Sequence, residues 1–409
     1  MADVQPLRAL HYDLAKVGPL ADLISPPYDV IDGPARAALA ARSPYNVVEI
    51  DLPEGGDDRY ARAGERFASW QADGVLVRDP EPALWALEQR HRDGVRRGFF
   101  ARVRVEEYGA GRIRPHERTH PGPREDRLRL TRATAANLSP IFSLHSDPTG
   151  AALAALAPAM EAEPWGDATD PDGVRHLLWR CADPDAIAAV QHALEGVELL
   201  IADGHHRYET ARVYADEIGG DGDHRYVLMA LVAIEDPGLA ILPTHRLVSG
   251  LDAARSAALG SVIERDFEAR PTRALAPPEG QGALAMGYLD RERSLALRLR
   301  DQAIADRALA DMPEPYRRLD TGVLEALILK GALGLSDDDI SHLHGLGYAR
   351  DVEEAAAAVQ SGACDAAFIM RPTPVALVRE IAAAGVNMPP KSTYFSPKLP
   401  TGLLFNALA

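Results

Sequence analysis

The most informative stretch of this chain is Leu199-Leu200-Ile201-Ala202-Asp203-Gly204-His205-His206-Arg207-Tyr208-Glu209-Thr210-Ala211. Its first four residues are apolar and have the character of a β-strand, which Asp203 and Gly204 then interrupt. The residues that follow have the pattern of an amphipathic helix, so two histidines and Arg207 fall on its first turn. This order of residues predicts a strand, a tight turn and a helix.

The predicted turn has the chemistry of an anion-binding site. The first backbone N–H groups of a helix have no partner within the helix and carry the positive end of its dipole. A phosphate placed there would meet these donors as well as Arg207. In the alternative interpretation, His205 and His206 are surface residues and Asp203 only caps the helix, a role that we expect of Asp203 in either case.

The size and composition are those of a soluble protein with more than one lobe. The chain has 409 residues, and a single core seldom grows beyond about 250 to 300 residues. No apolar run approaches the roughly 18 residues of a membrane helix. The start of the chain lacks the basic and apolar regions of a secretory signal. We therefore expect a cytoplasmic protein without a membrane partner.

The net charge and the rare residue types limit the kinds of molecule that this protein is expected to bind. The net charge of −16 argues against nucleic acid, because nucleic-acid binding depends on a basic surface. A local basic pocket for a small phosphate compound is compatible with this charge. Lysine is rare beside arginine, and Lys391 and Lys398 lie close together, which suggests that an ammonium group is needed there. Cys181 and Cys364 suggest neither a disulfide framework nor a cysteine-based zinc site.

The pattern of strands and helices predicts an α+β fold, because the two alternate without a strict βαβ rhythm. We expect strands at residues 46–52, 84–90, 98–106, 141–145, 174–181, 226–234 and 239–247. We expect helices at residues 57–73, 124–137, 253–266, 319–333, 352–360 and 374–384. The strands 84–90 and 98–106 flank a short polar segment and predict a β-hairpin. Three lobes are expected, with residues 1–107, 108–250 and 251–409.

Residues 116–120, His-Glu-Arg-Thr-His, have the letters of a zinc-peptidase signature. That motif depends on a helix that turns both histidines toward one metal ion. Pro115 and the Pro-Gly-Pro run at residues 121–123 argue against a helix here, so we expect no zinc site. Glu117 is instead a candidate general base that takes a proton from a hydroxyl group. A solvated surface carboxylate is the alternative.

Two further groups are candidates for substrate binding. Arg127 opens a predicted helix and either faces a substrate carboxylate or pairs with Asp126. Thr244, His245 and Arg246 end an apolar strand, where polar side chains must find partners. The run at residues 388–398, which contains Lys391 and Ser392, is either part of a site or an extended tail packed by its aromatic residues.

Residues 204–211 resemble the nucleotide-binding turn of the ParB/sulfiredoxin superfamily, in which a Gly-x-x-Arg core holds phosphates. Within it, the turn is most similar to that of the free-serine kinases, which share Asp-Gly-His-His-Arg and an earlier Pro-His-Glu with the catalytic base. The matching residues here are Pro115-His116-Glu117. Sulfiredoxin activity is excluded, because its turn needs a cysteine where this chain has His205. Nearly the whole chain is also similar to the family known as domain of unknown function 1015, in these blocks: residues 26–30, 46–47, 116–119, 202–208, 244–246 and 388–393.

The resemblance implies a mixed-sheet ParB/sulfiredoxin-like core in residues 108–250, elaborated by N- and C-terminal α/β lobes, with a Lys391 loop returning to the site. It implies a kinase that transfers a phosphoryl group from ADP or ATP to a metabolite hydroxyl, with free L-serine as the first choice and O-phosphoserine as the product. Mg²⁺ would enter with the nucleotide. The alternative is a ParB-like regulatory protein that binds or hydrolyses nucleotide without phosphorylating a metabolite.

The candidate site residues form three groups. The catalytic group is Glu117, Asp203 and His206. The nucleotide-binding group is Gly204, His205, His206, Arg207 and Thr210. The substrate-binding group is His116, Thr119, Arg127, Thr244, His245, Arg246, Lys391 and Ser392.

Overall fold

The computed structural model describes residues 2–92, 94–108, 112–117, 121–273, 275 and 284–409. The chain divides into two compact units. Unit 1 contains residues 1–115, 119–240 and 397–409, and unit 2 contains residues 116–118 and 241–396. Residues 1–107 and most of residues 108–250 therefore lie in unit 1, where strands from both build the same sheet, whereas residues 116–118 and 241–250 belong to unit 2. The last residues of the chain also belong to unit 1.

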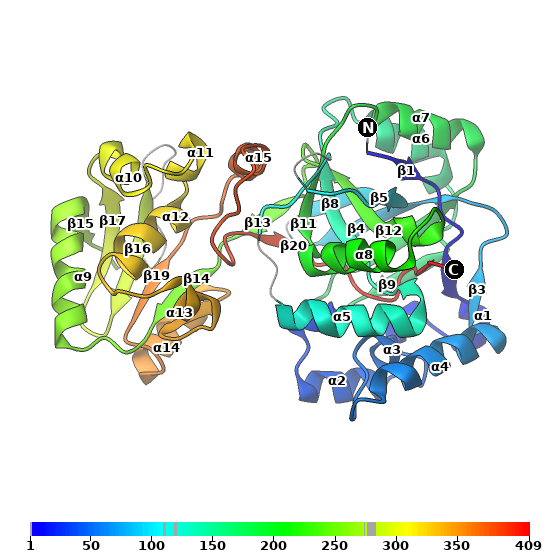
Figure 1. The fold of residues 1–409 in the computed structure, drawn as a ribbon, viewed down its shortest axis with the longest axis horizontal. Coiled ribbons are helices and arrows are strands. Elements are labelled where there is room, and N and C mark those ends of the chain that lie inside the picture. Colours follow the sequence, from blue (N-terminus) through cyan, green and yellow to red (C-terminus); the bar gives the residue numbers. More distant parts are fainter. Residues whose placement is uncertain (1, 93, 109–111, 118–120, 274, 276–283) are drawn as a thin grey trace. The chain divides into compact units, whose positions relative to one another are not determined.

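The main sheet of unit 1 has nine strands, in the order β6-β11-β8-β12-β5-β4-β10-β9 with β1 beside β5 (Figure 1). The strands are β1 (Val4–Gln5), β4 (Leu84–His91), β5 (Gly94–Arg104), β6 (Ile113–Arg114), β8 (Ile141–His145), β9 (Gly166–Thr169), β10 (Arg175–Cys181), β11 (Leu199–Asp203) and β12 (Tyr226–Ala233). The pairs β12–β8 and β11–β6 are parallel, and β4 and β5 form the predicted antiparallel hairpin. The mixed directions agree with the α+β prediction.

Helices cover the main sheet. The helices α6 (Ala151–Met160), α7 (Pro184–Ala193) and α8 (His205–Ile218) contribute Leu156, Val190 and Tyr208 to a core that includes Phe99 and Ile201 of the strands. Figure 1 shows α5 (Pro121–Thr134) between α8 and α4 (Arg59–Ala72), and α5 contacts both. The burial of these apolar side chains is the main favourable contribution to the stability of the unit.

Unit 2 is built on a six-stranded antiparallel sheet in the order β15-β17-β16-β19-β14-β18. The strands are β14 (His245–Val248), β15 (Phe267–Pro271), β16 (Ala285–Asp290), β17 (Ser294–Leu299), β18 (Leu346–Ala349) and β19 (Ala366–Ile369). Successive residues of β19 point to opposite faces: Phe368 packs in one apolar cluster and Ile369 in another. The sheet is therefore covered on both faces.

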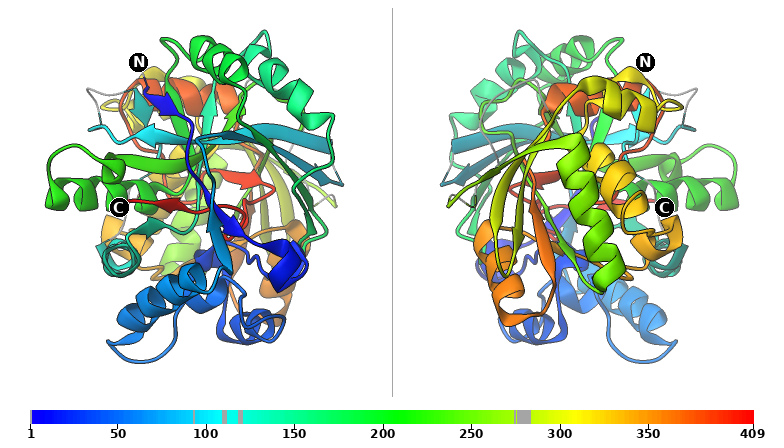
Figure 2. Two further views of the ribbon diagram at one scale, coloured as in Figure 1. Left: turned by 90° about the vertical axis from the view of Figure 1, so that its right-hand side faces the viewer. Right: turned by 90° about the vertical axis from the view of Figure 1, so that its left-hand side faces the viewer.

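Each face of this sheet has its own helices. The first face carries α9 (Ala253–Asp266), α10 (Gln302–Ala308), α12 (Asp320–Leu324) and the π-helical segment Glu325–Lys330, and α14 (Val352–Ser361) covers the second. Figure 2 shows the long helix α9, in yellow-green, lying along the strands of the first face. None of the described helices in either unit is long and apolar enough to cross a membrane.

The shorter elements complete the order. The strands are β2 (Leu10–Tyr12), β3 (Leu76–Arg78), β7 (Ala136–Asn137), β13 (Ala240–Leu242), β20 (Tyr394–Ser396) and β21 (Asn406–Ala407). The helices are α1 (Leu14–Val17), α2 (Gly33–Ala40), α3 (Val48–Asp51), α11 (Glu314–Arg317), α13 (Asp337–Ser341) and α15 (Val375–Ala383).

Three predicted elements differ from the structure. The strand predicted at residues 46–52 is wrong: the segment forms helix α3, because the Asn46 side chain accepts a hydrogen bond from the Val48 N–H at 3.0 Å and turns the chain into a helix. The strand predicted at 239–247 is broken into β13 and β14 at Pro243, which has no N–H to donate. The helix predicted at 319–333 begins as α12 and continues as the π-helical segment.

Candidate functional site

The predicted strand, turn and helix are present in unit 1. Strand β11 ends at Asp203, Gly204 has a φ of 99°, and α8 begins at His205. Only glycine adopts this conformation easily, and a Cβ atom at position 204 would lie 3.0 Å from Nε of Arg207. The N-cap position of α8 is held by Gly204, which has no side chain that could cap the helix. The turn is therefore suited to the approach of an anionic group to the start of the helix.

The prediction that Asp203 caps this helix is wrong. Its carboxylate lies between two cations: Oδ2 is 2.6 Å from Nη2 of Arg207, and Oδ1 is 2.6 Å from Nζ of Lys398. Burial alone would raise the pKa of Asp203, but the charges of Lys398 and Arg207 hold it far below its ordinary value. Asp203 is thus ionised and joins the turn to the C-terminal segment of the chain.

Arg207 is held by more than its pair with Asp203. Its Nη1 donates to Oγ of Ser139 at 2.9 Å and to the carbonyl oxygen of Pro140. Ser139 Oγ in turn accepts a hydrogen bond from Oγ1 of Thr401 at 3.0 Å. The guanidinium is therefore fixed beside the open helix end by groups from three separate segments of unit 1.

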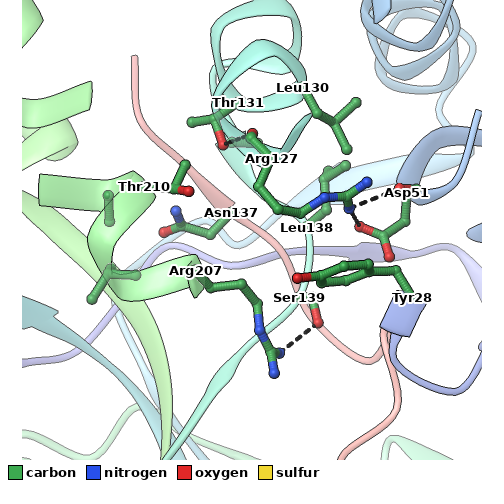
Figure 3. Close-up of a pocket in the computed structure, with 13 residues that line it drawn as sticks. Tyr28, Asp51, Arg127, Leu130, Thr131, Asn137, Leu138, Ser139, Arg207 and Thr210 are labelled. Carbon is green, nitrogen blue, oxygen red and sulfur yellow. Dashed lines mark hydrogen bonds and ion pairs between the residues drawn. The ribbon is translucent and has the colours of Figure 1, made fainter. Parts of the chain in front are cut away.

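A small cavity of about 40 Å³ lies next to this guanidinium (Figure 3). It has room for about one water molecule. Its lining brings together residues that lie far apart in the sequence: Tyr28, Asp51, Arg127, Ser139, Arg207 and Thr210 are among them. The structure thus places two predicted site residues, Arg127 and Thr210, in one cavity with Arg207.

Arg127 lies at the opposite side of this cavity and is paired within the protein. Its Nη1 is 3.1 Å from Oδ1 of Asp51, its Nη2 is 2.6 Å from Oδ2 of Asp126, and its guanidinium lies 4.2 Å from the ring centre of Tyr28. Burial raises the pKa of Asp51, and Arg127 opposes this shift. From the sequence, we expect Arg127 to bind a substrate carboxylate. Such a carboxylate would have to compete with these two internal carboxylates.

The two histidines of the turn occupy different environments. His205 is buried, and its electrostatic interaction with Asp203, after those of Lys398 and Arg207, contributes to the lowered pKa of Asp203. His206 is half-buried on the first turn of α8. Both therefore stand where the sequence predicted, at the start of the helix.

In unit 2, Arg246 of β14 is buried. Its guanidinium donates to the carbonyl oxygens of Thr244 at 2.5 Å and Pro390 at 2.9 Å, and lies 5.4 Å from the ring centre of Tyr348. Burial lowers the pKa of Arg246 to about 10. Within the described part of the chain no carboxylate lies within ion-pair distance of Arg246, and such a cation is suited to an anionic ligand.

Glu117 belongs to the same unit as Arg246. Its charge and that of Glu325 raise the pKa of Arg246 against the effect of burial. The neighbouring His116 is buried, and its Nε2 forms a hydrogen bond with Oγ1 of Thr393 at 2.8 Å. The carbonyl oxygen of His116 accepts the N–H of Met388. The backbone beside Glu117 is thus held against the segment around residues 388–393.

Other predicted substrate residues of unit 2 have internal partners. Nδ1 of the buried His245 accepts the N–H of Met370 at 3.1 Å, and Oγ of Ser392 donates to the carbonyl oxygen of Pro389 at 2.7 Å. These hydrogen bonds stabilise the start of β14 and the turn at residues 389–392. Lys391 is exposed, with a φ of 56°. The predicted residue Thr119 lies outside the described residues.

Sequence reasoning assigned no site role to several residues of these two groups. In unit 1 these are Tyr28, Asp51 and Ser139, and in unit 2 they are Glu325 and Tyr348. Tyr28 carried a signal, because it lies in the block at residues 26–30, and Lys398 was singled out as one of few lysines in an arginine-rich chain without being given a place in the site. Glu325 opens the π-helical segment, a form of helix that is often found at functional sites.

The fold and the turn define an α+β protein of two units with an open helix N-terminus beside ionised side chains. The chain belongs to the family described as protein of unknown function (DUF1015), whose model matches residues 4–322. No curated protein matches the chain.

The chain is similar to several solved structures, among them the following three. A conserved hypothetical protein from Pyrococcus furiosus has 16% identity over 71% of this chain and 90% of its own, with a TM-score of 0.37. Free serine kinase in complex with AMP has 15% identity over 73% and 88%, with a TM-score of 0.38. SbnI from Staphylococcus aureus, truncated at its C-terminus, has 12% identity over 74% and 85%, with a TM-score of 0.39. Similarities of this size do not assign a role to any residue.

Proposed function

We propose that this protein is a small-molecule kinase that transfers a phosphoryl group from ADP or ATP to a metabolite hydroxyl, with free L-serine as the first candidate acceptor. In the same proposal, unit 1 contains a ParB/sulfiredoxin-like core. The observation that carries the proposal is the arrangement at the start of α8, where Arg207 and Lys398 share one carboxylate beside a helix end whose N-cap is Gly204.

The donor part of the proposal rests on charge in unit 1. Asp203 neutralises one of its two cations, so Arg207, Lys398 and Asp203 together carry one net positive charge next to the helix dipole. A nucleotide phosphate would be stabilised by this charge and by the backbone N–H groups of residues 205–207. His205, His206 and Thr210 are assigned to the same phosphate group.

The acceptor part rests on unit 2. A free amino acid carries a carboxylate, and Arg246 is a buried cation without a carboxylate at ion-pair distance in the described residues. Arginine has five N–H donors, and its backbone contacts here use two of its nitrogens. We assign the acceptor carboxylate to Arg246, with Thr244, Lys391 and Ser392 around it, and proton removal from the acceptor hydroxyl to Glu117.

In this proposal, Mg²⁺ binds only together with the nucleotide. Asp203 is an ionised carboxylate at the turn, and Mg²⁺ prefers oxygen ligands of this kind. No group of three or more histidine, cysteine or acidic side chains among the described residues is arranged to hold a metal ion. When bound, Mg²⁺ would neutralise charge on the phosphates. The protein's own residues position the two oxygens and take up the proton.

The test is transfer of labelled phosphate from ADP or ATP to L-serine by the purified full chain and by Glu117→Gln. The variant keeps the size of the side chain and removes its basicity, so transfer should fall at least a hundredfold. Nucleotide affinity, measured by calorimetry, should stay within twofold. Glu292→Gln is the matched control, because Glu292 is an exposed glutamate of the same unit, and its activity should equal that of the unchanged protein.

Two outcomes would overturn the proposal. Full activity of Glu117→Gln would remove the assigned base. Nucleotide binding without transfer to any hydroxy compound in a mixed set would instead favour the regulatory protein that binds or hydrolyses nucleotide.

A further inference from the structure

Unit 1 contains a second, larger cavity that the kinase proposal does not use. Its volume is about 320 Å³, within the range of small-molecule pockets. Its lining comes from β5, β8, β12, the start of α6 and the loop after β12. None of the residues around the α8 turn contributes to it.

The strand register explains the floor of this cavity. Leu231 of β12 lies opposite Phe99 of β5, and Ala233 of β12 lies beside His145 of β8. Side chains alternate between the faces of a sheet, so Leu231 and Ala233 point to the same face. The rings of Phe99 and His145 lie 6.0 Å apart on that face. The floor is thus apolar with a single imidazole.

His145 is the unusual member of this lining. It is 2% exposed, and within the described part of the chain its Nδ1 has no hydrogen-bond partner. Burial lowers the pKa of His145 to about 4, although Asp147 and Glu235 oppose this shift. The ring is therefore neutral at pH 7. Nδ1 itself has no accessible surface, so the imidazole contributes a neutral ring to the cavity wall.

Two acidic side chains of the lining, Asp147 and Glu235, are already held by hydrogen bonds. Asp147 accepts the N–H groups of Ala151 and Ala152, and so occupies the N-terminus of α6. Glu235 accepts hydrogen bonds from Ser146 and from the N–H of Asp147. Because the helix end is taken by a carboxylate, an anionic ligand would find no donors there and would be repelled.

Two further charges face the same cavity. Asp236 accepts N–H groups from Arg97 and Gly238, and adds a third carboxyl group. The guanidinium of Arg97 is paired with Glu88 at 2.6 Å, so it offsets little of this negative charge. The cavity thus combines an apolar floor with a negative rim.

We propose that this cavity is a binding site for a compact organic cation, with an apolar body against the half-buried Leu153 and Ala233 and an ammonium group at the carboxylates of Asp147, Glu235 and Asp236. The site is separate from the nucleotide site of the proposed kinase, and its occupancy does not depend on phosphoryl transfer.

Three probes of nearly equal shape test the charge preference: benzylamine, benzyl alcohol and benzoate. Calorimetric or NMR titration of the full chain at pH 7 should give the tightest binding for benzylamine, with at least a tenfold weaker affinity for benzoate. Equal or tighter binding of benzoate, or no binding of benzylamine at millimolar concentration, would overturn the proposal. This comparison uses the unchanged protein and does not depend on a variant that folds.

A pair of variants locates the binding. Glu235→Gln removes one rim charge and keeps an oxygen for Ser146, so benzylamine affinity should fall at least threefold while benzyl alcohol binds as before. Glu161→Gln removes an exposed glutamate at the other end of α6 and should leave both affinities unchanged. Equal losses in the two variants would mean that benzylamine responds only to overall charge, which would contradict the site.

Discussion

Nζ of Lys398 lies 2.6 Å from Oδ1 of Asp203, although 195 positions separate the two residues. Asp203 ends a strand of the main sheet, and Lys398 stands on the C-terminal segment that belongs to the same unit. The other carboxylate oxygen is held by Arg207. The open end of α8 is therefore built from the middle and the end of the chain together.

Replacing Lys398 by methionine should weaken nucleotide binding. Arg207 would then be neutralised by Asp203, and the net positive charge at the turn would be lost. We expect ADP and ATP to bind at least tenfold more weakly, about 1.4 kcal/mol, by calorimetry at low salt. Lys16→Met removes an exposed lysine of the same unit and serves as the control. If both variants bound ADP and ATP with equal affinity, Lys398 would have no role in phosphate binding.

Gly204→Ala should disturb both the turn and the site. The φ of 99° costs an alanine about 1 to 2 kcal/mol, and the new Cβ would press against Nε of Arg207. Gly219 at the other end of α8 also has a positive φ, 70°, but a Cβ there meets nothing within 4 Å. Thermal unfolding should show a loss in both alanine variants, whereas nucleotide titration should show a loss of affinity for Gly204→Ala alone.

Local patterns predicted much of unit 1 correctly. The change from an apolar strand to Asp203 and Gly204 marked the turn, and the polar segment between β4 and β5 marked the hairpin. These features depend on neighbouring residues, whose conformational preferences can be interpreted directly from the sequence. Asp203 was the exception: its type predicted a helix cap, but its carboxylate pairs with Arg207, four positions on, and with the distant Lys398.

The remaining residues of both groups depend on contacts between distant segments. Tyr28 and Asp51 reach the cavity because both lie against Arg127 of α5, from which they are far apart in the sequence. No periodicity indicates such a contact. The strand predicted at residues 46–52 failed for a related reason, since the hydrogen bonds of Asn46 to Asp22 and Ile24 fix this segment as a helix.

Removing Arg127 should destabilise unit 1 strongly. Asp51 is 3% exposed, and in Arg127→Met its carboxyl group would lose its paired cation while it stays buried. We expect a loss of about 3 to 5 kcal/mol in urea unfolding. The double variant Arg127→Met with Asp51→Asn removes both charges and should lose clearly less. The single variant Asp51→Asn completes the comparison. If the loss in the double variant equalled the sum of the losses in the two single variants, Arg127 and Asp51 would not be energetically coupled.

Arg246→Met tests the acceptor assignment separately from the donor. The methionine keeps an unbranched apolar side chain but removes the cation, so the KM for L-serine should rise at least tenfold while kcat changes by less than threefold. Nucleotide affinity should be unchanged. Arg350→Met, at an exposed position of the same unit, is the control. A fall in kcat with constant KM would place Arg246 near the transferred phosphate instead of the acceptor carboxylate.

The lowered pKa of His145 predicts a specific dependence of stability on pH. Above about pH 6.5, the ordinary value for histidine, the ring is neutral in both the folded and the unfolded chain. Between that pH and about 4, its pKa in the folded protein, only the unfolded chain takes up the proton, so the free energy of unfolding falls as the pH falls.

The difference between the pKa of His145 in the unfolded chain and in the folded protein corresponds to a loss of about 3 kcal/mol in the free energy of unfolding between pH 7 and pH 4. The glutamine of His145→Gln cannot titrate in this range, whereas the carboxylates away from position 145 titrate alike in the two proteins. Both proteins are unfolded in urea at pH 7, 6, 5 and 4. Between pH 7 and pH 4, the free energy of unfolding of the unchanged protein should fall by this amount more than that of His145→Gln. A constant difference across the four pH values would mean that the folded protein accepts the proton at His145 as readily as the unfolded chain does.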